Sequence, residues 1–322
     1  MIARIQQFLT LVLLLAGAAW ASLFAMRGNY ALAASGALLI VLGYALFLGV
    51  EFLLLVTFGA DATVARPTAL QLLRAWIGEA LRAPLVFCWR QPFRSRHVPD
   101  MTVDARAGQR GVVFVHGFFC NRGFWNSWMT LLRDRGIPFV AVNLEPAFGS
   151  IATYAGIIES AVVRIEAATG LSPVIVAHSM GGLAVRAWLA GRAGSNPPHR
   201  VITIASPHRG TWLARFSRAV NGLEMRSPSD WIEALAARES ADRSRFTCFY
   251  GHCDNIVFPA SVGTLPGADN RHVPATAHVQ MAYRAEVVNE ALRWLSPIAP
   301  TGEPARVGPA GAAQLQADFP RS

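Results

Sequence analysis

Two long apolar stretches dominate the first sixty residues of the chain. Residues 8–26 and 31–50 contain no charged side chain, and only the short connector 27–30 separates them. Each stretch is long enough as a helix to cross a hydrocarbon core of about 30 Å. The pattern therefore predicts a transmembrane hairpin over residues 1–60. Small residues near the end of the first stretch leave a cleaved signal peptide open as an alternative.

Glu51 interrupts the apolar pattern directly after the second stretch. A charge at the middle of a bilayer costs roughly 2.5–3.5 kcal/mol. The surrounding apolar segment is long enough to place Glu51 at the membrane interface. We therefore expect Glu51 to have no functional role.

The segment 61–110 is predicted to be an amphipathic and basic linker. Within it, residues 69–82 show helical periodicity. The apolar positions that share one face are Leu70, Leu73, Ile77 and Leu81. Such a helix can lie flat on a membrane with its arginines toward the headgroups, or pack on the following domain as an ordinary amphipathic helix. The pattern does not distinguish these two arrangements.

From residue 111 the pattern changes to short apolar runs that alternate with helical segments. The predicted strands are 112–116, 138–143, 173–178, 200–205 and 246–250, and the predicted helices are 124–135, 151–169, 180–192 and 280–295. The strands are almost continuously apolar, as expected when helices cover both faces of a parallel sheet. The predicted fold class is therefore α/β, with a mostly parallel sheet between helices, preceded by two transmembrane helices.

We expect this α/β domain to span residues 111–297, with a cap near 210–245. The cap segment mixes large apolar side chains with arginines, which suits either a lid over a lipid-binding cleft or an ordinary helical cap with its own core. Residues 298–322 are rich in Pro, Gly and Ala and are predicted to form a disordered tail.

Composition and charge narrow the functional classes. Apolar residues make up 53% of the chain and charged residues only 15%, which supports the membrane prediction. The net charge of +9 comes from scattered arginines without a nucleic-acid-binding motif, so an anionic membrane surface is the expected partner and nucleic acid is not. The four cysteines show no metal-binding spacing. Cys248 and Cys253 are expected to be free thiols, although they are close enough in sequence to pair.

Arginine counts also predict the orientation in the membrane. Residues 61–97 carry six arginines, whereas the connector between the two apolar stretches carries only Arg27. The positive-inside rule then places both ends of the hairpin, and hence the large domain, on the cytoplasmic side of a bacterial-type inner membrane.

One candidate nucleophile stands at the end of a predicted strand. In Val-Ile-Val-Ala-His-Ser-Met-Gly-Gly, residues 174–182, an apolar strand reaches Ser179 and then continues into a glycine-rich helix start. Sites of parallel α/β sheets collect at the carboxyl ends of the strands. A sharp turn here would expose the Ser179 hydroxyl. It would also aim the Met180 amide at the position of a developing oxyanion.

The segment 177–182, Ala-His-Ser-Met-Gly-Gly, resembles the nucleophile elbow of the α/β-hydrolase fold and, within it, of lipase-like serine hydrolases. Alanine replaces the first glycine of the usual pentad. The His116-Gly117 turn after the first strand is similar to the family's oxyanion turn, and the resemblance then implies that the Phe118 amide is the second oxyanion donor.

The resemblance also implies the order serine, acid, histidine along the chain. His278 precedes the final amphipathic helix, where the family places its base, and Asp254 follows a strand, where the family places its acid. His252 and His272 are the nearest rivals of His278. The other acids between serine and base are expected in the cap, at Asp230 and Asp242, or in a turn, at Asp269.

These residues together predict a membrane-anchored serine hydrolase that cleaves carboxylic esters, with lipid esters as the expected substrates. In this hypothesis His278 activates Ser179, Asp254 orients His278, and no metal or cofactor is needed. Acyl-transferase or thioesterase chemistry on the same three residues is an alternative. A membrane-anchored hydrolase-fold protein that only binds a partner is another.

Overall fold

Six parallel strands form the centre of the protein in the order β2-β1-β3-β4-β5-β6. The computed structural model describes residues 1–102, 108–192, 196–239 and 243–295; the predicted tail 298–322 lies outside them. The strands are β1 (Val112–Val115), β2 (Phe139–Ala141), β3 (Val174–His178), β4 (Arg200–Ile204), β5 (Phe246–Tyr250) and β6 (Asp269–His272). The prediction of Asp269 as a turn residue is wrong, since it begins the edge strand β6 and aligns with Thr247 of β5.

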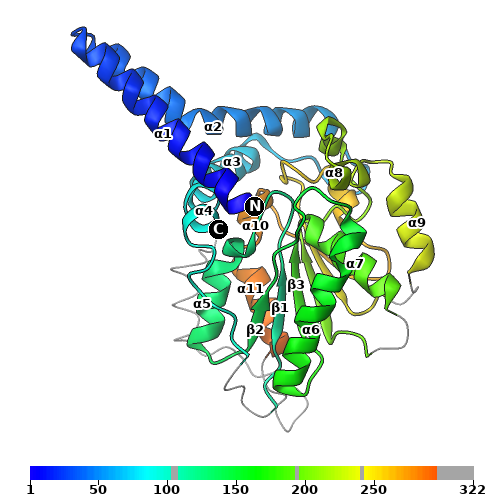
Figure 1. Cartoon of the computed structure of the whole chain (residues 1–322). Coiled ribbons are helices and arrows are strands. Elements are labelled where there is room, and N and C mark those ends of the chain that lie inside the picture. The colour runs from blue at the N-terminus through cyan, green and yellow to red at the C-terminus, as the bar shows by residue number, and fades with distance from the viewer. Residues whose placement is uncertain (103–107, 193–195, 240–242, 296–322) are drawn as a thin grey trace.

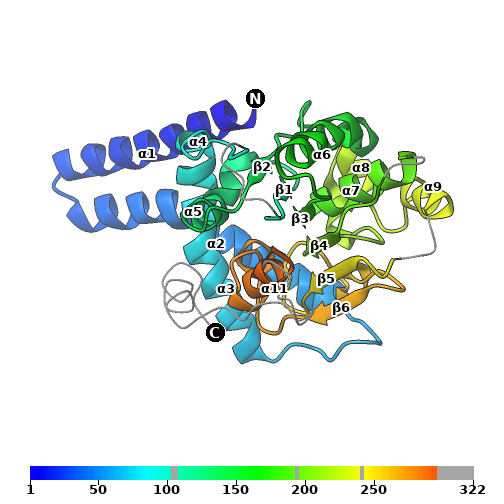
Figure 2. The same cartoon turned by 90° about the horizontal axis from the view of Figure 1, so that it is seen from below.

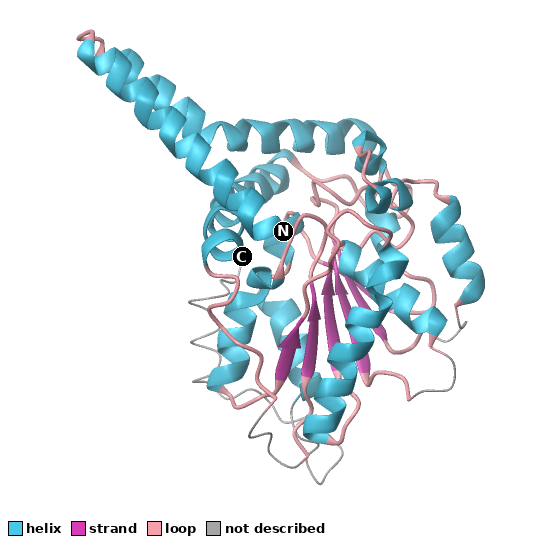
Figure 3. Ribbon diagram, viewed as in Figure 1, coloured by secondary structure: helices cyan, strands magenta, loops and turns pink. Residues whose placement is uncertain are grey.

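Helices cover both faces of this sheet (Figure 3). Alternate strand residues point to opposite faces. Val112, Phe114 and Val176 pack toward α5 (Asn126–Asp134) and α11 (Ala285–Leu295). Their neighbours Val113 and Ile175 pack on the other face, toward α6 (Ala155–Thr169) and α7 (Met180–Gly191). The predicted fold class is therefore confirmed.

Further helices connect the strands of the α/β domain. They are η2 (Arg122–Trp125), η3 (Ile151–Tyr154), α6 (Ala155–Thr169), α7 (Met180–Gly191), η5 (Ala260–Gly263) and α10 (His278–Met281). The last predicted helix, 280–295, is in fact two helices, because α10 ends at Met281 and α11 begins at Ala285. His278 consequently is the first residue of a helix rather than part of a loop.

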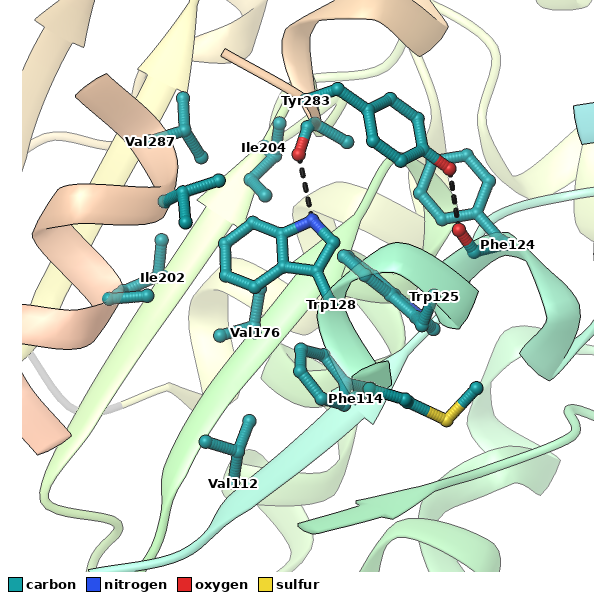
Figure 4. Close-up of a cluster of buried hydrophobic side chains, with 14 of the residues drawn as sticks. Val112, Phe114, Phe124, Trp125, Trp128, Val176, Ile202, Ile204, Tyr283 and Val287 are labelled. Atoms are coloured by element: carbon teal, nitrogen blue, oxygen red, sulfur yellow. Dashed lines mark hydrogen bonds between the residues drawn. The ribbon is translucent and has the colours of Figure 1, made fainter. Parts of the chain in front are cut away.

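Buried tryptophans tie α5 to the segment between α10 and α11 (Figure 4). The Trp128 indole N–H donates to the Ala282 carbonyl at 2.8 Å, and its ring packs edge-on to Phe114. On the same side the Tyr283 hydroxyl donates to the Phe124 carbonyl. These contacts fix the start of α11 against the sheet, immediately after the helix that carries His278.

Two long apolar helices precede the domain. They are α1 (Ile2–Met26) and α2 (Tyr30–Phe58), joined by a tight connection in which the Asn29 side chain accepts from the Leu32 amide. Figures 1 and 2 show α1 and the first part of α2 projecting side by side beyond the sheet. Both helices are long and apolar enough to cross a membrane, and little of their most apolar windows is buried within the protein.

The second part of α2 lies across the domain rather than projecting from it (Figure 1). The Tyr44 hydroxyl donates to the Ala80 carbonyl at 2.7 Å, and Leu48 is buried. Glu51 is also buried and accepts a 2.6 Å hydrogen bond from the Asn255 side chain. The expectation that Glu51 would simply reach the membrane interface is therefore wrong.

The amphipathic helix predicted at 69–82 is α3 (Ala69–Pro84), and a capping box of Thr68 and Gln71 defines its start. It packs on α10 and α2 through its buried residues Ala75 and Glu79. Its predicted apolar stripe faces outward instead, at Leu70, Leu73, Ile77 and Leu81. The π-helix η1 (Leu85–Arg90) and α4 (Gln91–Phe93) continue the chain toward the domain.

In its described residues, the predicted cap contains three short helices: η4 (Trp212–Phe216), α8 (Val220–Glu224) and α9 (Asp230–Arg238). Leu235 and Ile232 of α9 are buried, which gives the cap apolar packing of its own. The Trp212 ring stacks on Phe58 at the end of α2, with ring centroids 4.1 Å apart. The cap therefore contacts the N-terminal helices as well as the sheet.

Candidate active site

Ser179 lies between β3 and α7 in a backbone conformation that non-glycine residues seldom adopt. Its φ and ψ angles are 54° and −128°. Such strain costs on the order of 1–3 kcal/mol and persists only where the surroundings enforce it. The Ser179 amide donates to the Ile204 carbonyl at 2.8 Å, which fixes the turn against the end of β4.

Two glycines allow this turn to approach β1 and the segment that follows it. A Cβ at Gly181 would lie 2.7 Å from the His116 carbonyl oxygen, and a Cβ at Gly117 would lie 2.8 Å from the Ser179 Cβ. Neither distance is sterically tolerable, so both positions require glycine. The His116-Gly117 turn predicted from the sequence therefore lies directly against the serine.

The two predicted oxyanion donors are the backbone amides of Phe118 and Met180, which directly follow Gly117 and Ser179. Met180 is the first residue of α7, so its amide has no acceptor within the helix. Phe118 follows Gly117, and its ring packs edge-on against Phe148 with centroids 5.8 Å apart. This arrangement places an aromatic surface beside the serine turn.

Asp254 and His278 form a buried hydrogen-bonded pair. His278 Nδ1 donates to Asp254 Oδ1 at 3.0 Å and lies 3.1 Å from Oδ2. The amides of Ile256 and Val257 also donate to Oδ1, at 2.9 and 2.8 Å. Because a carboxylate only accepts, the proton is on Nδ1 and His278 Nε2 is left as the basic nitrogen.

The environment of His278 favours its protonated form. Burial by itself lowers the pKa of the imidazole, but the adjacent Asp254, together with Glu79 and Glu51, outweighs burial and raises that pKa above its ordinary value. An imidazole that gains a proton readily is suited to accept one from a hydroxyl.

His178 connects this pair to the serine turn. The residue directly precedes Ser179, and its Nε2 donates to the His278 carbonyl at 3.2 Å. Burial keeps the pKa of His178 well below its usual value, so it stays neutral. Among the described residues, no hydrogen bond joins the Ser179 hydroxyl to His278. Catalytic hydrogen bonds are often long before substrate binds and tighten in the complex.

The rival histidines have other surroundings. The His252 and His272 rings pack against each other, with centroids 4.6 Å apart. In the part of the chain described, neither ring is hydrogen-bonded to Asp254. His116 accepts from the Leu144 amide through Nε2 at 3.0 Å, and burial lowers its pKa to about 4. It therefore supports the turn after β1. Of the rival acids, Asp230 begins α9 in the cap, whereas Asp242 lies outside the described residues.

Sequence reasoning missed three polar residues of the N-terminal helices that contact the loops of the site. Glu51 bonds to Asn255, Glu79 accepts from the Val279 amide, and Gln6 donates to the Phe119 carbonyl. The one available signal was Glu51, the sole charged residue between 31 and 58. Its partner could not be read from the sequence.

No cluster of three or more His, Cys, Asp or Glu side chains suited to a metal occurs in the described ranges. Cys248 and Cys253 are both buried free thiols, as expected.

Comparison with known proteins identifies the class. Residues 112–317 match the sequence profile of the alpha/beta hydrolase family, and the chain belongs to this family. Lipase B of Aspergillus fumigatus is similar in structure with a TM-score of 0.52 and 19% identity, over 66% of this chain and 57% of the lipase. The mature lipase BlEst2 of Bacillus licheniformis has a TM-score of 0.49 and 16% identity, over 56% of this chain and 89% of its own.

At 19% identity the structure of lipase B shows the shared fold alone. No curated protein sequence matches the chain. The resemblance to the α/β-hydrolase fold, which the elbow residues 177–182 indicated, is thus confirmed at the level of the family.

Proposed function

We propose that this chain is a membrane-anchored serine hydrolase of carboxylic esters. Ser179 is the nucleophile, His278 the general base, and Asp254 the residue that orients and stabilises the imidazolium. The amides of Phe118 and Met180 hold the oxyanion. The observation that carries the proposal is the buried Asp254–His278 pair, joined through His178 to the strained serine turn.

The reaction follows from these roles. The Ser179 oxygen bonds to the ester carbonyl carbon while its proton passes to His278 Nε2. The tetrahedral oxyanion then collapses, and His278 returns the proton to the departing alcohol, leaving an acyl ester on Ser179. A water molecule attacks this ester after losing a proton to His278. The carboxylic acid departs, and the serine oxygen regains the proton.

The N-terminal helices support a membrane location. The first side-chain hydrogen bond from α2 to a later element is at Tyr44, and at 1.5 Å per residue the preceding residues 30–43 are about 21 Å long. A hydrocarbon core of about 30 Å is thicker. A hairpin inserted to its base would therefore bring the adjoining surface of the domain into the membrane interface.

That surface is apolar enough for such a position. The outward face of α3 and the docked part of α2 expose large apolar side chains, among them Leu46, Phe47, Leu53, Leu70, Leu73, Ile77 and Leu81. The carboxyl ends of the strands, where Ser179 lies, are directed toward these same helices (Figure 3). This proximity supports lipid esters as the substrate class and the membrane as the partner.

A fluorophosphonate probe tests the chemistry directly, because it phosphonylates only an activated serine. Full-length protein in detergent is expected to be labelled, and Ser179→Ala to be unlabelled at the same folded concentration. A panel of p-nitrophenyl esters, phospholipids and acyl thioesters should show ester cleavage that is lost in Ser179→Ala.

Two results would overturn the proposal. Absence of labelling on folded protein would favour a hydrolase-fold protein that only binds a partner. Labelling without ester cleavage, but with thioester cleavage or acyl transfer, would assign the same residues to a different acyl bond.

A further inference from the structure

We infer that the N-terminal helices complete the active site, with Gln6, Glu51 and Glu79 as positioning residues for its three loops. This inference rests on the proposed function, since it concerns the same serine, acid and base. Each of the three side chains is buried, comes from a different N-terminal helix and contacts a different loop of the site.

Glu51 of α2 contacts the loop of the acid. Asn255, the residue after Asp254, donates from its side chain to Glu51 Oε2 at 2.6 Å. The oxygen of the same Asn255 amide accepts from the His278 backbone amide at 3.2 Å. Glu51 therefore sets the orientation of an amide that joins the acid loop to the base.

Glu79 of α3 contacts the helix of the base. Its two carboxylate oxygens accept from the amides of Val279 and Gln280, both at 2.9 Å. These are the second and third residues of α10, which begins with His278. A carboxylate at this end of α10 satisfies two amides that have no acceptor within the helix. It thus fixes the helix start from which the imidazole projects.

Gln6 of α1 contacts the oxyanion turn. Its side-chain amide donates to the carbonyl of Phe119 at 3.1 Å. Phe119 follows the predicted oxyanion donor Phe118 and has a φ of 54°, a conformation unfavourable for a phenylalanine. The hydrogen bond from α1 holds this residue in place.

Burial of two carboxylates is unfavourable unless hydrogen bonds compensate for the lost hydration. Burial raises the pKa of Glu79 to about 7, even though both backbone amides favour its charged form. Ordinary helix packing would be served as well by apolar residues at these positions. The Glu51 and Glu79 carboxylates accept hydrogen bonds from the acid loop and from the helix of the base. Such hydrogen bonds fix the orientation of their donors, which apolar packing does not.

Matched variants of the full-length protein test the inference. Glu79→Gln keeps the shape but has one acceptor oxygen for two amides, so the second-order rate of fluorophosphonate labelling should fall about 10- to 100-fold. The labelling rate of Glu51→Ala should fall by a similar factor. Glu51→Gln can still accept a hydrogen bond from Asn255, so its labelling rate should stay within about threefold of the wild-type rate. This rescue by the conservative variant at position 51 separates a directed bond from general packing.

Two control variants change side chains of the same N-terminal region that bond to other parts of the protein. Asp61, also in the N-terminal region, accepts from the Ser261 amide in η5, away from the acid and base loops. Gln7, next to Gln6, donates to the Pro92 carbonyl instead of to Phe119. Asp61→Asn and Gln7→Ala should label at the wild-type rate, whereas Gln6→Ala should label more slowly.

Steady-state kinetics with a p-nitrophenyl ester provides a second readout. A positioning role lowers kcat with little change in KM. The titratable groups facing His278 are Asp254, Glu79, Glu51 and the neutral His178. With its pKa of about 7, Glu79 carries part of a negative charge where His278 titrates. Glu79→Gln removes that charge and should move the acidic limb of the kcat/KM profile to lower pH, which a change in packing alone would not do.

All labelling rates are compared at temperatures where circular dichroism shows that each variant is folded. If a Glu51 or Glu79 variant does not fold, the labelling rates of Gln6→Ala and Gln7→Ala test the inference instead. Labelling of Glu79→Gln, Glu51→Ala and Gln6→Ala at the wild-type rate would overturn the inference while leaving the proposed function intact. Failure of the wild-type protein to label would instead overturn the proposed function, so the two failures are distinguishable.

Discussion

His278 Nδ1 lies 3.0 Å from Asp254 Oδ1, although the two residues belong to separate segments that follow β5 and β6. The carboxylate is itself held by the amides of Ile256 and Val257. The orientation of the imidazole is therefore determined by a group that the backbone fixes. This relationship makes the proposed roles of the two residues testable one at a time.

Asp254→Asn should abolish most activity without unfolding the protein. An asparagine can present its N–H₂ to His278 and favour the wrong imidazole tautomer, a change that lowers kcat about 10⁴-fold in serine proteases. Ester hydrolysis by purified protein measures the effect. Asp269→Asn is the matched control, because the half-buried Asp269 pairs with Arg271 away from His278 and should change activity by less than about twofold. Equal losses in both variants would contradict the role of Asp254.

The pH dependence of activity should report His278. The imidazole must be neutral to accept the serine proton, and the neighbouring carboxylates hold its pKa above the ordinary value of 6.5. As the pH falls through the raised pKa, His278 becomes protonated and kcat/KM declines. The acidic limb of the profile should therefore have its midpoint above pH 6.5. A midpoint well below this value would show that another group limits the rate.

Gly117→Ala should reduce activity sharply, because the new Cβ would lie 2.8 Å from the Cβ of Ser179. The oxyanion turn or the serine must then shift, and a displacement of about 1 Å costs on the order of 10²-fold in rate. Gly156→Ala in α6 provides the control. A Cβ there has nothing within 4 Å, so helix propensity predicts unchanged activity and a gain of roughly 0.8–1 kcal/mol in stability.

The cap should depend on a buried ion pair. Arg186 of α7 binds Glu239 with two hydrogen bonds, at 2.6 and 2.7 Å, just after α9, and both side chains are buried. Glu239→Ala would leave the arginine charge uncompensated, at a cost of about 3–5 kcal/mol in the free energy of unfolding. Urea denaturation in detergent measures the loss.

The exposed pair of Arg133 and Asp134 serves as the comparison for this prediction. Asp134→Ala should cost no more than about 1 kcal/mol, because water already solvates that carboxylate. A similar cost in both variants would mean that burial does not govern the contribution of the Arg186–Glu239 pair.

Fractionation tests the membrane proposal. The full-length chain should remain with membranes after carbonate extraction, which removes peripheral proteins. If the arginines of residues 61–97 determine orientation, protease added to intact spheroplasts should spare the domain and digest it only after lysis. Digestion before lysis would place the domain on the opposite side of the membrane.

The sequence alone determined the features that depend on local patterns. Continuous apolar runs predicted five of the six strands, and the small residues around Ser179 predicted a sharp strand-to-helix turn, because such a turn excludes larger side chains. The edge strand β6 was missed because Asp269-Asn-Arg-His carries no apolar signal. β6 pairs with β5 through backbone hydrogen bonds, and these do not require apolar side chains.

Only the tertiary structure decided how distant segments meet. Glu51 and Asn255 are 204 residues apart in the sequence, and no local pattern signals that their side chains are hydrogen-bonded. The apolar surroundings of Glu51 suggest a membrane interface instead. Local periodicity likewise identified the apolar stripe of α3 but could not show that Glu79, on its other side, faces the base. Burial of a polar group depends on which partner satisfies it, and that partner is chosen by the packing of the whole chain.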